Sequence, residues 1–228
     1  TVGLSGLTFA RGRAYEDGGA ILSSGALTIA NCTFQNGRAS RGGAIYVGAG
    51  SLTSRNNHFT GNLAGRAGAI CLGGGTLNST ADTYTGNRAK YGGAIYQDGG
   101  SATFTGCTIA ENVASPGASF GGGLYLYNSN TTLMNCTISG NSSDDGSGAI
   151  NVDTTTLNVM NTTISGNSAG GYAGAMDIYD SNVNLISTTI AGNHALDPTY
   201  GDALGGISVG PGNWITGTNS IISGNSSA

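Results

Sequence analysis

A short apolar motif, Gly-Ala-Ile or a close variant, recurs eight times along this chain of 228 residues. The apolar residue that ends each copy follows the previous one after 24 to 31 residues, at Ile21, Ile45, Ile70, Ile95, Leu124, Ile150, Met176 and Ile207. A second motif keeps the same phase and consists of an aromatic residue or Ile followed three residues later by Asn, as in Phe59 and Asn62. A fixed period of this length is typical of a solenoid.

The Asn residues of the second motif would stack into a ladder along such a solenoid. They are Asn62, Asn87, Asn112, Asn141, Asn167, Asn193 and Asn225. The first two copies, which begin at Phe9 and Phe34, have Gly12 and Gly37 in place of Asn. Amide ladders stabilise strands that stack in register. We therefore interpret these Asn residues as structural.

Each repeat contains short strand-like segments separated by Gly, Asn and Ser. In Leu27-Thr28-Ile29 the apolar residues alternate with a polar one, Cys32-Thr33-Phe34 repeats that pattern, and the Gly-Ala-Ile segment supplies a third strand. Three short strands in about 25 residues predict one coil of a right-handed parallel β-helix, with about 4.8 Å between coils. The predicted fold is all-β, a single-domain right-handed parallel β-helix over residues 1–228 with about nine coils.

Two buried columns should run through this rod. One contains the apolar residues of the Gly-Ala-Ile motif, and the other contains Phe34, Phe59, Tyr84, Ile109, Ile138, Ile164 and Ile190. The 42 Gly residues suit tight turns and closely stacked coils. Apolar residues kept in register argue against a disordered chain. No apolar run is long enough for a transmembrane segment. Because the sequence starts at Thr1, we expect any secretion signal to lie outside it.

Charge is distributed unevenly along the chain. The first 90 residues contain eight basic and three acidic side chains, whereas the remainder contains nine acidic side chains and no basic one. The formal net charge of −4 argues against a nucleic-acid partner. Sequence order is axial order in a solenoid, so the rod should have a positive and a negative end. Compositional drift would explain this, but complementary ends would also steer head-to-tail encounters.

Three of the four cysteines, Cys32, Cys107 and Cys136, precede the Phe or Ile position by two residues. Cys107 and Cys136 should be neighbours on adjacent coils, within bridging distance, whereas Cys32 and Cys71 should stay unpaired. Cys is also a small core residue, so packing alone explains the pair equally well. No two cysteines have a spacing typical of metal ligands.

The segments Gly42-Gly43-Ala44-Ile45 and Phe59-Thr60-Gly61-Asn62 resemble the chlamydial polymorphic membrane proteins, whose passenger regions repeat GGAI and FxxN motifs. The resemblance covers nearly the whole chain. It implies a secreted β-helix that is extracellular or at a cell surface, often with an adhesive function. It provides no catalytic residues to transfer to this sequence.

Parallel β-helices also include polysaccharide-active enzymes, in which carboxylates cluster with a basic residue or His. The best candidate here is Asp144-Asp145, yet no Lys or Arg follows Lys90, and His58 and His194 are far apart along the chain. We therefore predict no catalytic residues, no cofactor and no metal site, and no enzymatic activity. The enzyme remains the third alternative.

Three further features remain open alternatives. Asp144, Asp145 and Asp177 could together supply oxygen ligands to Ca²⁺, although solvated turn acids are the simpler interpretation. Two coils are enlarged, by Ser115–Gly121 and Ala195–Ala203, and long turns often carry function. An outward Thr column could bind ice, but His58 and Ile221 interrupt it, and Thr is in any case a good exposed strand residue. The column comprises Thr8, Thr33, Thr83, Thr108, Thr137, Thr163 and Thr189.

Both ends of the chain are apolar where solenoids usually have a polar or helical cap. The residues concerned are Val2, Leu4, Leu7 and Phe9 in the first coil, and Trp214, Ile215, Ile221 and Ile222 in the last. These residues are the predicted self-association sites. The first coil is expected to lack a Gly-Ala-Ile strand, which would leave one strand position empty at a joint between copies.

The sequence thus predicts a non-enzymatic extracellular structural β-solenoid that binds itself head to tail, as a fibre or surface-layer subunit. The alternative is an adhesin passenger fragment whose partners are surface glycans or host-cell receptors. A piece excised from a longer solenoid would have the same bare ends.

Overall fold

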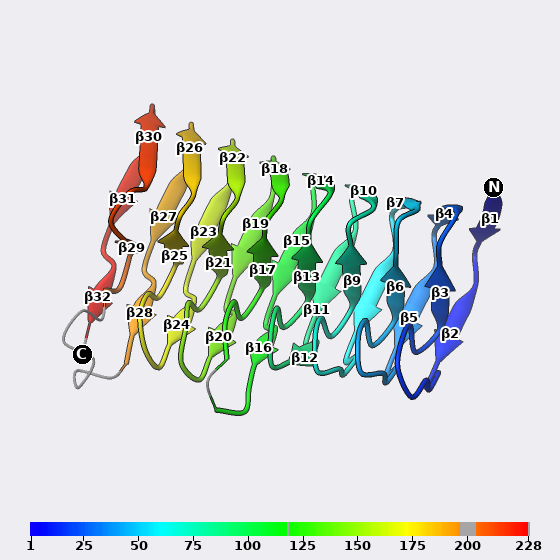
Figure 1. The fold of residues 1–228 in the computed structure, drawn as a ribbon. Coiled ribbons are helices and arrows are strands. Elements are labelled where there is room, and N and C mark those ends of the chain that lie inside the picture. The colour runs from blue at the N-terminus through cyan, green and yellow to red at the C-terminus, as the bar shows by residue number, and fades with distance from the viewer. Residues whose placement is uncertain (118, 197–203, 228) are drawn as a thin grey trace.

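The computed structural model describes residues 1–117, 119–196 and 204–227. The chain winds into a rod of stacked coils, with the N-terminus at one end and the C-terminus at the other (Figure 1). Four parallel sheets run along the rod, and each takes one strand from a coil. The described residues contain strands, turns and bends but no helix. The predicted all-β parallel β-helix is confirmed.

The first two sheets have nine strands each. Sheet 1 contains β1 (Val2–Ser5), β4 (Ala26–Ala30), β7 (Ser51–Arg55), β10 (Thr76–Thr80), β14 (Ser101–Thr105), β18 (Asn130–Met134), β22 (Thr156–Met160), β26 (Asn182–Ile186) and β30 (Trp214–Thr218). Sheet 2 contains β2 (Thr8–Ala10), β5 (Thr33–Gln35), β8 (His58–Thr60), β11 (Thr83–Thr85), β15 (Thr108–Ala110), β19 (Thr137–Ser139), β23 (Thr163–Ser165), β27 (Thr189–Ala191) and β31 (Ile221–Ser223).

The other two sheets are smaller. Sheet 3 contains β12 (Arg88–Ala89), β16 (Val113–Ala114), β20 (Ser142–Ser143), β24 (Ser168–Ala169), β28 (His194–Ala195) and β32 (Ser226–Ser227). Sheet 4, formed by the Gly-Ala-Ile segments, contains β3 (Ile21–Ser23), β6 (Ile45–Val47), β9 (Ile70–Gly73), β13 (Ile95–Asp98), β17 (Leu124–Tyr127), β21 (Ile150–Asp153), β25 (Met176–Tyr179) and β29 (Ile207–Val209).

Two details of the predicted coil were wrong. The prediction gave three strands per coil, but from β12 onward each coil has an additional strand of two residues in sheet 3, which is too short to leave a periodic pattern in the sequence. The first coil does have its Gly-Ala-Ile strand, β3, which pairs with β6. Among the described residues it is the last coil, with β30, β31 and β32, that has no strand in sheet 4.

Apolar side chains fill the rod as two stacked columns, as predicted. The Gly-Ala-Ile column is fully buried from Ile45 to Met176 and only partly buried at its ends, Ile21 and Ile207. In the other column, the nearly parallel rings of Phe34 and Phe59 stack with centroids 4.9 Å apart. This distance matches the separation of hydrogen-bonded strands, so ring stacking and backbone pairing share one period.

Left-handed backbone explains why Asn and Gly recur at the turn between sheets 1 and 2. Asn31, Asn56 and Asn135 have φ of 53°, 55° and 56° there. Asn and Gly adopt this region most readily. At the sheet 4 turn, Gly43 packs so closely against the next coil that a Cβ would clash with the carbonyl oxygen of Gly68. The turn chemistry thus fixes both the bend and the close approach of the coils.

The Asn ladder lies inside the turn that follows sheet 2, and it joins each coil to the next. Asn112 donates from its backbone N and from Nδ2 to Oδ1 of Asn141, at 3.0 and 2.9 Å. Nδ2 of Asn112 also donates to the carbonyl oxygen of Tyr84 in the preceding coil, at 2.9 Å. The same pattern links successive Asn residues from Asn62 to Asn225. Each side chain therefore connects three coils.

Replacing Asn141 by Ala should lower the free energy of unfolding by roughly 3 kcal/mol, because buried donors and acceptors on both neighbouring coils lose their partners. Urea denaturation of the intact chain measures this loss. Asn158→Ala, at a half-exposed position of β22, is the matched control and should change stability by less than about 0.5 kcal/mol. Equal losses in the two variants would contradict a stabilising ladder.

Candidate interaction surfaces

The N-terminal coil exposes apolar side chains that continue the internal columns. Val2 aligns with Leu27, Leu4 with Ile29 and Phe9 with Phe34. Leu4 and Phe9 pack partly against the core, but Val2 is 56% exposed. Leu7 is 44% exposed. β1 and β2 are the first strands of their sheets, so their outer edges have no partner strand among the described residues.

The four apolar residues predicted at the C-terminal end differ in orientation: two point into the rod and two point outward. Ile215 aligns with Val183 and Ile222 with Ile190, so both continue internal columns and are partly exposed at the end of the rod. Trp214 aligns instead with Asn182, and Ile221 with Thr189, which are outward positions. Trp214 and Ile221 therefore face sideways, because side chains alternate between the two faces of a strand. These two side chains do not continue the internal columns, and their part in self-association stays a prediction.

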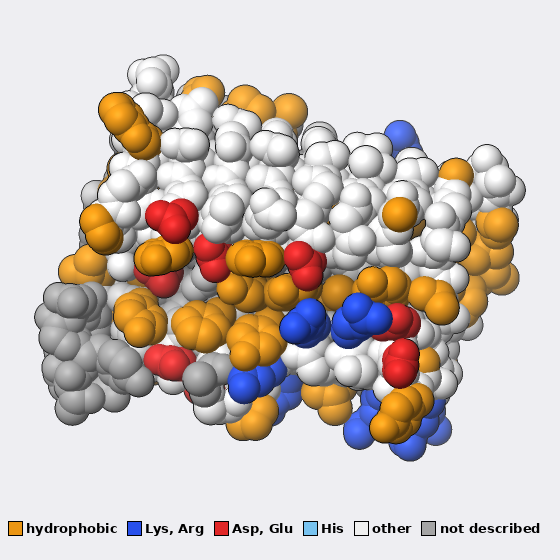
Figure 2. All heavy atoms as spheres, in the orientation of Figure 1, with side chains coloured by type: hydrophobic (Ala, Val, Ile, Leu, Met, Phe, Trp, Pro, Cys, Tyr) orange, Lys and Arg blue, Asp and Glu red, His pale blue; other side chains and the backbone are white. Residues whose placement is uncertain are grey.

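The two end surfaces lie at opposite ends of one rod (Figure 1), so a single molecule cannot bring them together. The charges follow the same axis. Figure 2 shows the blue Lys and Arg side chains toward the N-terminal half, and red carboxylates extending toward the C-terminal end. Near the N-terminus, Arg41 forms a two-pronged ion pair with Asp17, at 2.7 and 2.8 Å.

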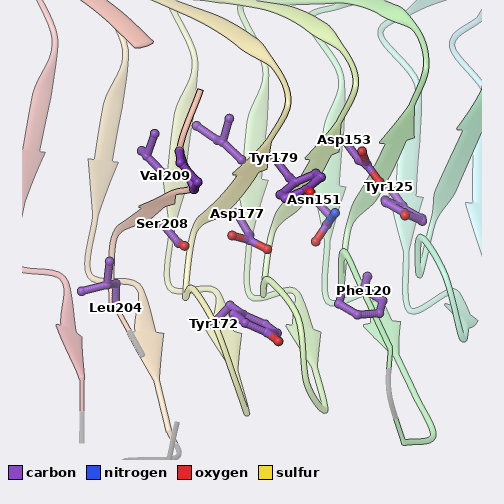
Figure 3. A pocket seen from close by; sticks show the side chains of 13 residues that line it. Phe120, Tyr125, Asn151, Asp153, Tyr172, Asp177, Tyr179, Leu204, Ser208 and Val209 are labelled. Carbon is purple, nitrogen blue, oxygen red and sulfur yellow. The ribbon is translucent and has the colours of Figure 1, made fainter. Parts of the chain in front are cut away.

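A lateral groove on the outer face of sheet 4 is the second candidate surface, and sequence reasoning missed it. Its floor is one column of outward residues, Tyr125, Asn151, Asp177 and Ser208, which are aligned on four successive strands. Figure 3 shows these side chains beside one another on β17, β21, β25 and β29. No motif marks the column, because the period constrains only the inward residues.

Two walls enclose the floor. One wall comes from the turns before sheet 4, with Phe120, Tyr172 and Leu204, and the other from strand ends, with Asp153 and Tyr179. The groove has a volume of about 680 Å³, within the range of small-molecule sites. Phe120 comes from the enlarged turn 115–121. Most of the other enlarged turn, 195–203, is not described, because its residues 197–203 lie outside the described residues.

Burial shifts the pKa values of two side chains in the floor of the groove, Asp177 and Tyr125. It raises the pKa of the Asp177 carboxyl above its ordinary value, although a hydrogen bond with Ser208 opposes the shift. Burial also raises the pKa of the Tyr125 phenol, and the nearby carboxylate of Asp153 adds to this effect. Tyr125 therefore stays neutral at physiological pH. The groove presents neutral aromatic rings beside carboxyl groups.

The cysteines occupy the coils as expected, and all four are free and buried. Thr137 N donates to the carbonyl oxygen of Cys107 at 2.9 Å, so Cys107 and Cys136 lie on adjacent coils. The contact with Cys136, together with burial, raises the pKa of the Cys107 thiol. Cys71 belongs to a separate buried cluster with Ala67 and Tyr96, on the outer side of sheet 4.

Other candidate sites do not assemble. Among residues 1–117, 119–196 and 204–227, no group of three His, Cys, Asp or Glu side chains could hold a metal ion, so Asp144, Asp145 and Asp177 do not form the predicted alternative Ca²⁺ site.

No helix in the described part of the chain has the length and apolarity needed to cross a membrane. The Thr column is broken by His58, which stacks between Thr33 and Thr83.

A buried polar network was also missed by sequence reasoning. The Asp82 carboxylate, 1% exposed, accepts hydrogen bonds from Asn57 N at 2.7 Å and from Ser79 Oγ at 2.6 Å. Burial raises the pKa of Asp82 despite these bonds. Asp82 lies in the Cys32 and Cys107 column, and no local signal distinguishes it from an exposed acid. It satisfies buried donors and belongs to the coil interior.

The described architecture defines a class of protein. Residues 77–228 match the family model described as a right-handed β-helix region. The match covers more than half of the chain, which therefore belongs to the right-handed β-helix family, and the predicted hand of the coil is confirmed. No curated protein and no solved structure matches the chain. The resemblance to chlamydial passenger repeats remains a prediction, and the fold by itself assigns no activity.

Alkaline pH should destabilise the protein through the Cys71 cluster. Burial raises the pKa of Cys71 to about 12, from an ordinary value of 9.0. The folded state keeps the thiol protonated while the unfolded state ionises, so the free energy of unfolding should fall as pH rises from about 9 to about 12. Denaturant unfolding across this range measures the fall, which should be shallower for Cys71→Ala. Identical slopes would contradict this assignment.

Proposed function

We propose that this chain is a non-enzymatic structural subunit, extracellular or at a cell surface, that associates head to tail with copies of itself. The supporting observation is the register at both ends. Val2 at one end, and Ile215 and Ile222 at the other, are exposed members of columns that are buried everywhere between, and Phe9 is a partly exposed member. The resemblance to secreted passenger repeats supports the extracellular location.

Stacking a second rod in the same register would continue each column. Val2 would lie over Ile215 and Phe9 over Ile222, while Leu4 would meet Gly217, whose lack of a side chain leaves room for it. The outer edge of β30 would pair with β1, as strand addition does in other β proteins. A parallel joint of this kind is heterologous, so it propagates into a fibre.

The energetics favour a weak, concentration-dependent joint. Burying a half-exposed aliphatic side chain contributes roughly 1 kcal/mol, and the two faces offer only a few such groups. Association costs at least about 4 kcal/mol, so backbone pairing must contribute the remainder. The described residues of the last coil contribute no strand to sheet 4, and the joint would leave that position unfilled. Charge complementarity along the axis would set polarity and rate more than affinity.

Blocking either end should stop fibre growth without unfolding the rod. Leu7→Asp alone and Ile222→Asp alone should each be monomeric, because every joint would bury an unpaired charge. Mixed in equal amounts, the two variants should form dimers and nothing larger, since each retains one intact face. Analytical ultracentrifugation at high protein concentration distinguishes these species, and circular dichroism confirms folding.

Leu22→Asp is the matched control, since Leu22 is 62% exposed on the outward side of the first coil. This variant should assemble like the unmodified chain. Added salt should slow assembly without preventing it, because screening weakens steering more than burial. A chain that stays monomeric at high concentration, or a mixture that forms no dimer, would exclude head-to-tail association.

An adhesive surface module is the second candidate function, and the lateral groove favours it. Tyr172 and Tyr179 are exposed beside polar groups on a rigid sheet, an arrangement suited to binding surface glycans or receptor side chains. A polysaccharide-active enzyme is less well supported. Asp153 and Asp177 share the groove, but no basic residue follows Lys90 to bind or activate an acidic sugar.

A further inference from the structure

Aromatic rings contact one another along the outer face of sheet 4. Tyr96 contacts Tyr125 edge to face, with ring centroids 5.2 Å apart. Tyr91 stacks on Phe120 at 6.2 Å, and Phe120 in turn lies 6.2 Å from Tyr125. Tyr46 lies in the same column as Tyr96, with Cys71 between them, and Phe120 and Tyr125 line the lateral groove. Figure 2 shows orange hydrophobic side chains across the middle of the rod, with blue and red side chains among them.

In the first half of the rod, the chain itself places a cation against these rings. Arg41 Cζ lies 4.7 Å from the ring centroid of Tyr46, and Arg66 Cζ lies 5.3 Å from that of Tyr96. Lys90 Nζ lies 5.4 Å from the ring centroid of Tyr91. Cations at such distances from a ring face are attracted by its negative potential. Each of these cations comes from the turn that precedes sheet 4.

In the second half, the rings persist but the chain supplies no cation. Arg41 and Arg66 align with Tyr91 and then Phe120, and no Lys or Arg follows Lys90 anywhere in the sequence. The lateral groove opens over this half. Carboxyl groups of Asp153 and Asp177 line it beside the rings. The groove is therefore negatively charged. It contains aromatic rings like those that Arg41, Arg66 and Lys90 contact in the first half, but no cation of the described chain lies against them.

The floor of the groove also contains a buried acceptor without a partner. Asn151 is 6% exposed, and its Oδ1 has no hydrogen bond. Asn151 lies between Tyr125 and Asp177 in the floor column, and Figure 3 shows it in that place. A buried acceptor left unpaired is costly. Asn151 lines the groove, but its Oδ1 atom is itself buried beneath the groove surface.

We propose that the lateral groove binds an organic cation with an alkylguanidinium or alkylammonium group, held against Tyr125 and the neighbouring rings and donating to Asp153 and Asp177. Such groups are donors without acceptors, which matches the acceptors of the floor and wall. The bound cation would take the place that Arg41, Arg66 and Lys90 occupy in the first half of the rod. A carboxylate or phosphate ligand would be repelled there. This site is independent of head-to-tail stacking.

Paired probes that differ in charge test the proposal on the intact chain. Nα-acetyl-arginine amide and Nα-acetyl-lysine amide represent the two cation types, and Nα-acetyl-citrulline amide is the neutral isostere of the first. Isothermal titration calorimetry at fixed ionic strength should show saturable binding of at least one cation, about tenfold or more tighter than the citrulline compound. Which cation binds more tightly identifies the preferred headgroup.

Variants then locate the site. The double variant Asp153→Asn with Asp177→Asn should weaken cation binding by at least about tenfold, because both charges that favour the cation are removed. Asp180→Asn is the matched control: Asp180 is exposed, next to Tyr179, but does not line the groove, and it should bind like the unmodified chain. Circular dichroism checks that each variant is folded.

Three results would overturn the proposal. The first is equal affinity for the arginine and citrulline probes, which would show that charge is not recognised. The second is undiminished binding by the folded double variant. The third is the absence of saturable binding for both cations up to roughly 10 mM.

Discussion

Hydrogen bonding between parallel strands of successive coils is the interaction on which the rest of this structure depends. It sets one spacing for the whole rod, and every column must fit it. The stacked rings of Phe9, Phe34, Phe59 and Tyr84 lie 4.7 to 4.9 Å apart, in step with the backbone. The Asn ladder uses the same step, since each amide reaches the coil on either side. The columns repeat with the coils, although single buried positions such as Asp82 carry a different side chain.

Outward positions are free of this constraint, and the chemistry of the surface can therefore change along the axis. On the outer face of sheet 4, one column runs from Tyr46 through Tyr96 and Tyr125 to Asp177. In the first half of this face, Arg side chains from neighbouring turns cover the tyrosine rings. In the second half the rings line an open groove that also contains carboxyl groups. The rigid scaffold thus supports two different surfaces. A regular interior makes an irregular exterior possible at low cost in stability.

Much of the fold was predictable because its signals are periodic. The register of the Gly-Ala-Ile copies and of the Phe and Ile copies follows directly from their spacing, and the structure pairs Ile150 with Met176 and Ile138 with Ile164 accordingly. The two-residue strands of sheet 3 were not predictable, since two residues carry no period. The apolar character of Trp214 and Ile221 also did not reveal that both point outward, because the outward positions of a strand carry no constraint on residue type.

The sequence by itself determined the coil, its period, its inward columns and the axial order of its charges, because each is written into local repeats. The tertiary structure decided which outward residues meet. Phe120, Asn151, Tyr172 and Ser208 are up to 88 positions apart in the chain, yet coil stacking brings them to one groove. It also decided which polar groups are buried, such as Asp82 and Asn151. Burial depends on neighbours from other coils, and a single repeat contains no information about them.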